Sequence, residues 1–260
     1  MGKTKSKEKE ELFDSTMSLG DHLEELRARL ILAFLGLVIG TIICLFFGGK
    51  IIDFIKAPYE SVMGEDAPLQ TLSPADGFVS YMKISLVAGL ILSSPWVFYQ
   101  LWMFVAAGLY PKERQYVHKA VPFSVVLFVT GALFFLFIVA PLALGFLVKF
   151  NKSVLGVRSN FTFQNYISFV TTLMLVFGVA FQTPIAIFIL NKTGLVSIQA
   201  LRRSRKFAIL GIFIVAAMAT PPDVISQVTL AIPLYFLYEL GILLCYFTKR
   251  KKKKQSTNTD

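Results

Sequence analysis

The stretch Ala28–Gly48, "ARLILAFLGLVIGTIICLFFG", decides the fold class of this chain. It carries no charged residue after Arg29. Crossing a bilayer core of about 30 Å takes about 20 consecutive apolar residues in a helix. We therefore predict a membrane-spanning helix over 28–48. The composition of all 260 residues agrees, because 55% are hydrophobic and 16% are charged, whereas soluble domains carry about 25% charged residues.

Five further apolar runs follow this first span. They predict an all-α integral membrane protein, a bundle of six transmembrane helices. The fifth run has only 14 residues, so a helix there would be about 21 Å long. A tight Pro-Pro-Asp turn joins it to the sixth run, which predicts a short hairpin in a thinned bilayer or a recessed corner of the bundle. The five runs are 77–98, 119–142, 164–190, 207–220 and 225–246.

The basic residues predict the orientation of the spans. Twenty of the 26 Lys and Arg residues flank one side of the predicted bundle, five flank the other, and Lys83 lies inside the second span. Because basic loops stay in the cytoplasm, we expect both termini there. The chain is then one membrane domain with three parts: a cytoplasmic N-terminal segment (1–27), a six-helix bundle (28–246) and a polybasic tail (247–260) that attracts anionic membrane lipid.

Motifs for catalysis, metal binding or nucleic-acid binding do not stand out in the sequence. The histidines, His22 and His118, have no ligand partners at metal spacing. The "GGK" at 48–50 lacks the spacing of a phosphate-binding loop. Basic residues are not interleaved with aromatic ones in a nucleic-acid pattern. We therefore expect no enzyme, no catalytic residue, no cofactor, no metal and no nucleic-acid partner.

Two acids stand directly before the first span, in "DHLEELRARL" at 21–30. From residue 19 to residue 30, leucines recur on one helical face, which predicts a short amphipathic helix leading into the span. Glu25 with Arg29, and Glu24 with Arg27, have the spacing of local ion pairs, worth about 0.3–0.5 kcal/mol each. On these residues alone, local pairing is the simpler interpretation, and a receptor role for the acids is the alternative. The leucines are Leu19, Leu23, Leu26 and Leu30.

Another acid on the same side, Glu113, closes the stretch "SPWVFYQLWMFVAAGLYPKE" at 94–113. Lys112 and Arg114 flank it, so it could be a solvated neighbour of these bases. An acid beside apolar and aromatic surface is also a good receptor for a cationic peptide with hydrophobic neighbours. The predicted spans hold few polar residues, among them Gln182, Gln227 and Glu239, which either hydrogen-bond between helices or contact a partner helix.

Three separated motifs give the chain a family resemblance. "HLEELRARL" at 22–30, "SPWVFYQLWMFVAAGLYPKER" at 94–114 and "TPPDVISQVTLAIPLYFLYELG" at 220–241 resemble motifs of the TatC family, in the same order. The resemblance implies a receptor and scaffold subunit of the twin-arginine protein translocase, a concave helix bundle in a bacterial-type plasma membrane. It implies binding of twin-arginine signal peptides on folded cargo, and export driven by the proton-motive force. Its partners would be TatA-type subunits, with or without separate TatB-type ones, and further copies of itself.

The resemblance also assigns roles to residues. It implies that Glu25 and Glu113 bind the signal arginines. Many family members have glutamate where this chain has Gln182, and an amide cannot titrate, so a proton relay at this position is excluded here. The further signal-peptide residues are Phe104, Leu26 and Arg27; the partner-helix contacts are Gln182, Gln227 and Phe181; the structural positions are Pro58 of "KAPY", Asp223 and Glu239.

Two alternatives remain beside this interpretation. A small-solute secondary transporter would have paired half-helices and several acids near the membrane midplane. A purely structural membrane scaffold would not depend on Glu25 or Glu113.

Overall fold

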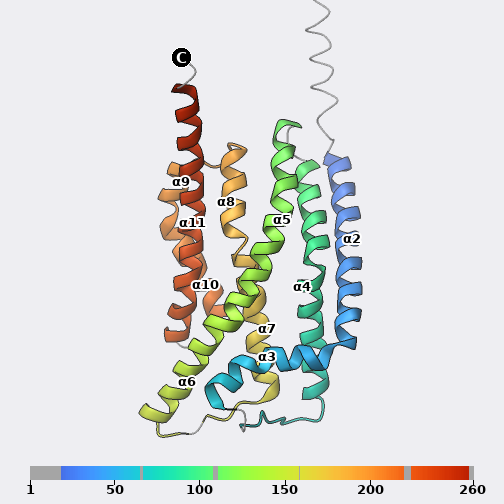
Figure 1. Ribbon diagram of the computed structural model, residues 1–260, viewed down its shortest axis with the longest axis vertical. Coiled ribbons are helices and arrows are strands. Elements are labelled where there is room, and N and C mark those ends of the chain that lie inside the picture. The colour runs from blue at the N-terminus through green and yellow to red at the C-terminus, as the bar shows by residue number, and fades with distance from the viewer. Residues whose placement is uncertain (1–18, 65–66, 108–110, 158, 220–223, 258–260) are drawn as a thin grey trace, which may run out of the picture.

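A computed structural model of the chain describes residues 19–64, 67–107, 111–157, 159–219 and 224–257 (Figure 1). The regular structure within these ranges is helical, apart from one isolated bridge between Gln70 and Thr162. The elements are α2 (Leu19–Phe46), α3 (Gly48–Met63), α4 (Asp76–Ala107), α5 (Pro111–Phe134), a π-helical turn η1 (Phe135–Val139), α6 (Ala140–Val154), α7 (Phe163–Ala180), α8 (Thr183–Lys192), α9 (Ile198–Arg203), α10 (Arg205–Ala219) and α11 (Val224–Thr257).

Five stretches of the described chain are long and apolar enough to cross a membrane: Leu23–Phe46, Asp76–Ala107, Ala120–Val154, Phe163–Lys192 and Gln227–Phe247. The sixth predicted span is α10, whose 15 residues reach about 22 Å. The prediction of a six-helix membrane fold with a short last hairpin is therefore confirmed. The start of α2 and the end of α11 lie at the same end of the bundle (Figure 1).

Several predicted boundaries were wrong, because helices continue where loops were expected. The amphipathic segment and the first span form one helix, α2, and α11 runs on past residue 246 to Thr257. The aromatic stretch after residue 98 belongs to α4. Pro95 cannot donate a hydrogen bond to the carbonyl of Ile91, but the Ser94 hydroxyl donates to that carbonyl at 2.7 Å. This replacement lets α4 continue through the proline.

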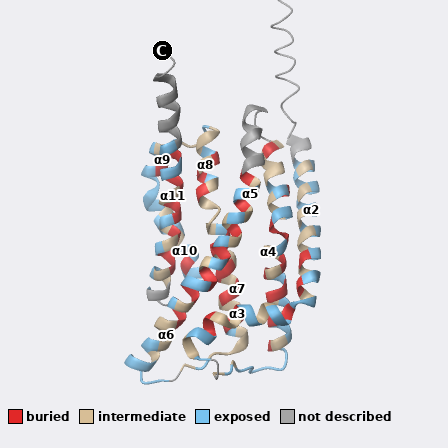
Figure 2. Cartoon of the chain, viewed as in Figure 1, coloured by how far each residue is buried: buried red, intermediate tan, exposed pale blue. Residues whose placement is uncertain are grey.

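Glycines fix the register of α2 against α4. A Cβ on Gly40 would lie 2.6 Å from the carbonyl oxygen of Gly89, so the two backbones approach as closely as small residues permit. Further along, the Trp96 indole N–H donates to the carbonyl of Leu32 at 2.8 Å. The helices run antiparallel (Figure 1). In Figure 2, α2 shows little buried surface, as expected for a helix that faces lipid on its other sides.

The core gathers around α7. Its inward residues are fully buried, among them Ile167, Val170, Leu173 and Phe177, and they pack against Phe135 of the π-helical turn. The predicted span 164–190 is broken, because α7 ends at Ala180 and α8 starts at Thr183. Pro184 lacks the N–H that would continue the helix ladder. The break places Phe181 and Gln182 in a turn within the span.

The outer connections pack across the far end of the bundle. The predicted loop 49–76 contains α3, which crosses the ends of other helices in Figure 1. Pro58 is therefore a buried residue inside a helix. The Tyr166 hydroxyl donates to the carbonyl of Ile55 at 2.6 Å, and Phe163 N–H donates to the carbonyl of Gln70 at 2.8 Å. A spacing of four between Ile51, Ile55 and Tyr59 is the sequence signal that could have predicted α3.

Candidate functional site

The site at the start of α2 is built around an incompletely paired carboxylate. Arg29 Nη2 lies 3.4 Å from Glu25 Oε1, so the predicted pair is confirmed. Arg29 Nη1 donates to Oε1 of Gln100 on α4 at 3.2 Å. The guanidinium is thus divided between two acceptors on two helices, and Gln100 itself is only 2% exposed.

The second oxygen of Glu25 has an unusual position. Oε2 is buried and accepts no hydrogen bond from any described residue, while the Glu25 side chain as a whole is 21% exposed. Leaving a buried acceptor unsatisfied costs about 1–3 kcal/mol, and more when it is charged. Glu25 therefore has acceptor capacity that the described protein does not use.

The neighbours of Glu25 on α2 are exposed. Glu24 and Arg27 were predicted to pair, and this was wrong: the ion pairs of the described chain are Glu25–Arg29 and Arg205–Glu239. Both side chains lie in solvent, where the gain from an ion pair barely exceeds the entropy lost in holding it. Leu26 is also exposed. Leu26 and Arg27 therefore remain accessible beside the carboxylate.

Phe104 comes from the neighbouring helix. Because α2 and α4 are antiparallel and Gln100 meets Arg29, Phe104, one turn further along α4, comes level with Glu25. Its side chain is half-buried. Between these positions the Trp102 indole donates to the Ser124 hydroxyl on α5 at 2.8 Å. α4 thus contacts α2 through Gln100 and α5 through Trp102.

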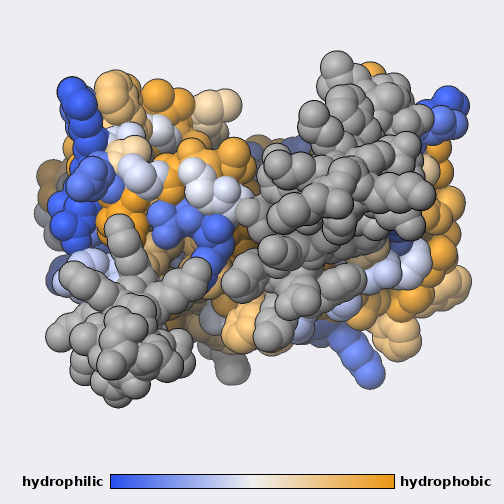
Figure 3. Space-filling model, turned by 90° about the horizontal axis from the view of Figure 1, so that it is seen from above, coloured by the Kyte–Doolittle hydropathy of each residue, from blue (hydrophilic) through white to orange (hydrophobic). Residues whose placement is uncertain are grey.

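The second predicted acid, Glu113, lies in the first turn of α5. Its side chain is outside the described residues, so its proximity to Glu25 stays a prediction. α5 begins at the end of the bundle where α2 begins (Figure 1). Figure 3 looks onto this end; the hydrophilic side chains gathered beside apolar ones lie on its left, the side of α9 and α11 in Figure 1, and not at α2.

Gln182 and Phe181 occupy the break between α7 and α8. The Gln182 amide donates to the carbonyl of Ser124 at 2.9 Å, whereas its Oε1 is buried and has no partner in the described chain. The Phe181 ring lies 5.5 Å from that of Phe134 and covers Gly131. The predicted interhelical hydrogen bond of Gln182 is formed, and a contact with a partner helix stays a prediction.

Gln227 joins the two helices of the short hairpin. Its amide donates to the carbonyl of Phe213 on α10 at 2.9 Å, so it too bonds within the chain. Asp223, in the turn of the hairpin, lies outside the described residues. An apolar groove of about 560 Å³ runs between α7, α10 and α11, lined in part by Val179, Gly211, Val215 and Leu234.

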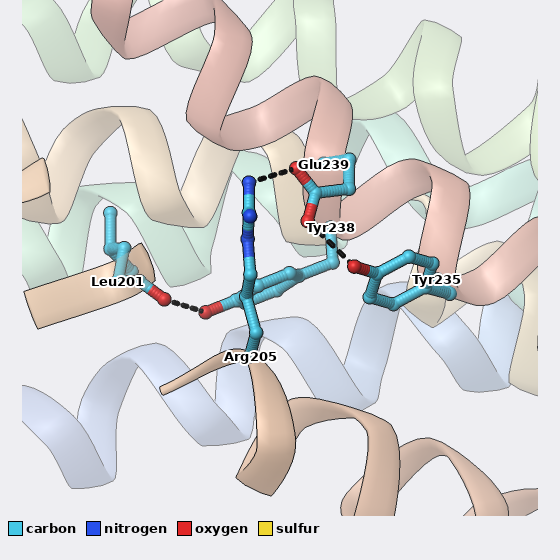
Figure 4. A network of polar contacts seen from close by, with 5 residues as sticks. All are labelled: Leu201, Arg205, Tyr235, Tyr238 and Glu239. Carbon is cyan, nitrogen blue, oxygen red and sulfur yellow. Dashed lines mark hydrogen bonds and ion pairs between the residues drawn. The ribbon is translucent and has the colours of Figure 1, made fainter. Parts of the chain in front are cut away.

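Glu239 is fully paired, as Figure 4 shows. Arg205 Nη2 lies 2.8 Å from its Oε2, and the Tyr235 hydroxyl donates to its Oε1 at 2.8 Å. Beside it, the Tyr238 hydroxyl donates to the carbonyl of Leu201 at 2.8 Å. These bonds fasten α9 and α10 to α11, so the interpretation of Glu239 as a link between helices is confirmed.

The comparison with known families agrees with the motifs. The family described as "Sec-independent protein translocase protein (TatC)" matches residues 21–233. The chain belongs to the TatC family. It is thus a TatC-type component of a Sec-independent protein translocase, and a multi-pass membrane protein.

Relatives and solved structures resemble this TatC-family chain over most of its length. The TatC proteins of Aquifex aeolicus and Escherichia coli K12 are 39% and 36% identical to it, over 92% and 90% of this chain and 98% and 90% of their own. Two crystal structures of the twin-arginine translocase receptor TatC superpose with TM-scores of 0.79 and 0.80, at 38% and 39% identity. They cover 88% and 86% of this chain and 99% and 98% of theirs.

Sequence reasoning missed four residues that shape these sites in the TatC-family chain: Gln100, Ser124, Arg205 and Tyr235. Gln100 carries a detectable signal, because it is an amide inside an apolar helix, where polar side chains are rare and need partners. Tyr235 also carries one, because it stands four residues before Glu239 on α11, where side chains meet. Ser124 and Arg205 carry none, because a serine or a flanking arginine is common near membrane surfaces. Only the packing of helices far apart in the sequence reveals the partners of these two residues.

Proposed function

We propose that this chain is the receptor and scaffold subunit of a twin-arginine translocase. Glu25 and Glu113 bind the adjacent arginines of signal peptides on folded cargo, and Phe104, Leu26 and Arg27 surround them. The observation that carries this proposal is the buried Oε2 of Glu25, to which no described residue donates a hydrogen bond. The two superposed crystal structures are those of a twin-arginine translocase receptor, which supports it.

The chemistry of the pair suits this task. Arginine presents a planar fork of donors that fits a carboxylate with two parallel bonds, and lysine does not. Two separate carboxylates can each bind one of two adjacent arginines. The chain carries ten more positive than negative charges, which repels cationic peptides that do not meet a well-placed acid.

Orientation and location follow from the same role. Signal peptides arrive from the cytoplasm, so the start of α2 and the end of α11 face the cytoplasm of a bacterial-type plasma membrane. The excess of Lys and Arg on that side supports this orientation. The chain then acts as one membrane domain over 1–260, with segment 1–27 and the polybasic tail 247–260 at the cytoplasmic surface, where the tail contacts anionic lipid.

Partner subunits bind elsewhere on the same chain. A TatA-type single helix lies along the α7–α11 side, with Gln182, Phe181 and Gln227 as contacts. Two observations support this placement: Oε1 of Gln182 accepts no hydrogen bond from the described part of the chain, and an apolar groove lies between α7, α10 and α11. A TatB-type helix is a second candidate partner. Several copies of the chain form the receptor complex, and export uses the proton-motive force.

The experiment is photocrosslinking of a twin-arginine signal peptide to membranes that contain the full translocase. We expect Glu25→Ala or Glu113→Ala to weaken the adduct and the double variant to abolish both the adduct and export. Glu239→Ala is the matched control, because its carboxylate is already bound on both oxygens. Undiminished crosslinking and export in the double variant would refute the site.

The transporter alternative gains no support from the described residues. It needs ionisable groups near the midplane, but the break between α7 and α8 carries the non-titrating Gln182. Glu239 is bound by Arg205 and Tyr235.

A further inference from the structure

The pairing of Arg29 with Glu25 is geometrically incomplete. A guanidinium can bind a carboxylate with two parallel hydrogen bonds. Here a single nitrogen of Arg29 lies near Oε1, at 3.4 Å. The other terminal nitrogen, Nη1, turns to Gln100 at 3.2 Å, and Oε2 of Glu25 receives no donor from the described chain.

Gln100 is the group that keeps this pairing open. It is 2% exposed and lies on α4, whose register against α2 is fixed by the contact of Gly40 with Gly89 and by the bond from Trp96 to Leu32. Its amide oxygen is therefore held in place between the helices. As long as it accepts Nη1, the end-on pairing of both terminal nitrogens of Arg29 with the two oxygens of Glu25 is not formed.

We propose that Arg29 is an internal competitor for Glu25, and that Gln100 restrains this competitor so that the carboxylate can receive a guanidinium from a peptide. The inference rests on the proposed role of Glu25. The terminal torsion of a glutamate is broad, and the Glu25 side chain is one-fifth exposed. Either carboxylate oxygen can therefore turn toward a ligand, and Arg29 and Gln100 act as positioning residues behind it.

This arrangement predicts opposite effects for its two members. Arg29→Gln removes the competitor, so affinity for an arginine-pair peptide rises about two- to fivefold, the range of a partly exposed ion pair. Gln100→Leu releases Nη1, Arg29 closes on the carboxylate with both nitrogens, and affinity falls by at least the same factor. The double variant binds like Arg29→Gln alone, because Gln100 then has nothing to restrain.

The test uses the full chain with its partner subunits in proteoliposomes and a fluorescent synthetic peptide that contains two adjacent arginines. Dissociation constants are measured for Arg29→Gln, Gln100→Leu and the double variant. Gln100→Asn is a second way to withdraw the amide oxygen while keeping a polar group. Glu24→Gln is the matched control, since it removes an exposed charge one position away and should leave affinity within twofold. Partial unfolding would lower binding in every variant, so it cannot produce a rise.

Each outcome separates this inference from the proposed function. Tighter binding in Arg29→Gln with weaker binding in Gln100→Leu supports it. Unchanged or weaker binding in Arg29→Gln overturns it, even if Glu25→Gln abolishes binding and the proposed function stands. Unchanged binding in Glu25→Gln refutes the proposed function at this residue, and the inference with it.

Discussion

Glu25 and Glu239 are both carboxylates in helices that cross the membrane, and their surroundings are opposite. Glu239 receives two donors at 2.8 Å, one on each oxygen. Glu25 has one long contact on one oxygen and none from described residues on the other. A carboxylate whose two oxygens both accept hydrogen bonds within the fold contributes to stability. A carboxylate with an oxygen that lacks a donor, at an exposed end of the bundle, is available to a ligand. The following changes test this distinction.

The largest effect is expected for Glu25→Ala on peptide binding. Removing one partner of a desolvated charge pair costs about 2–5 kcal/mol, which is a loss of at least about 30-fold in affinity. Glu239→Ala should change affinity less than twofold. Titration of a labelled arginine-pair peptide into membranes measures both. Equal losses of peptide affinity in the two variants would contradict a functional difference between Glu25 and Glu239.

Gly40→Leu should disrupt the packing of α2 against α4 around Glu25 and leave the surroundings of Glu239 intact. A side chain there meets the Gly89 carbonyl, so α2 must move from α4, at a cost of about 3 kcal/mol. Arg29 then loses Gln100, while the links of Glu239 to Arg205 remain. We expect a lower melting temperature and weak peptide binding. Gly145→Ala is the control, because a Cβ there meets nothing within 4 Å; an equal loss in this control would contradict the steric explanation.

Glu239→Ala should lower stability. It breaks an ion pair and a hydrogen bond that are partly exposed, together worth about 1–2 kcal/mol. For a protein of this size we expect the melting temperature to fall by about 3–6 °C, measured by thermal unfolding in detergent. Tyr235→Phe removes only the hydrogen bond and should cost about half as much. A Glu25→Ala variant that loses as much stability would contradict the assignment of Glu239 as the structural acid.

Gln182→Met should have a smaller effect on stability, because it loses one interhelical hydrogen bond to Ser124, worth about 0.6–1.7 kcal/mol in a membrane. Site-specific crosslinking from position 182 to a TatA-type helix gives an independent readout. If no adduct forms in the wild-type background, the partner role of Gln182 fails and only the internal bond remains.

The smallest effect is expected for Glu24→Gln. Its side chain is exposed and has no ion-pair partner in the described chain, so binding and export should stay within twofold of wild type. A large loss of peptide crosslinking would extend the receptor site from one glutamate of α2 to both.

Much of the fold could be predicted because apolar runs are local features of the sequence. The first span and the short α10 were expected from run length alone. Helix ends were less predictable: the second span was expected to end at residue 98, but α4 continues to Ala107. The Ser94 hydroxyl bond to the carbonyl of Ile91 supports the passage of α4 through Pro95. The helix α3 lies within the predicted loop 49–76 and was not predicted, because it is stabilised by the packing of Ile55 and Tyr59 on the core.

The candidate site was predictable in part. The Glu25–Arg29 spacing lies within one helix turn, and its contact is formed. Glu24 and Arg27 have an equally good spacing but no contact, because spacing alone does not decide whether an exposed pair forms. Phe104 was named by resemblance to the family, and Gln182 was first noted as a polar residue within a predicted span. The packing of both residues could not be predicted from the sequence.

The sequence by itself determined the number and order of the spans, the short hairpin and the family, because hydropathy and motifs are properties of neighbouring residues. Only the tertiary structure decided which acid has a hydrogen-bond donor on each carboxylate oxygen. Gln100 lies 71 positions from Arg29, and Arg205 lies 34 positions from Glu239. Donors and acceptors so far apart meet only when the helices pack in one register, and in α2 and α4 the close contact of Gly40 with Gly89 sets that register.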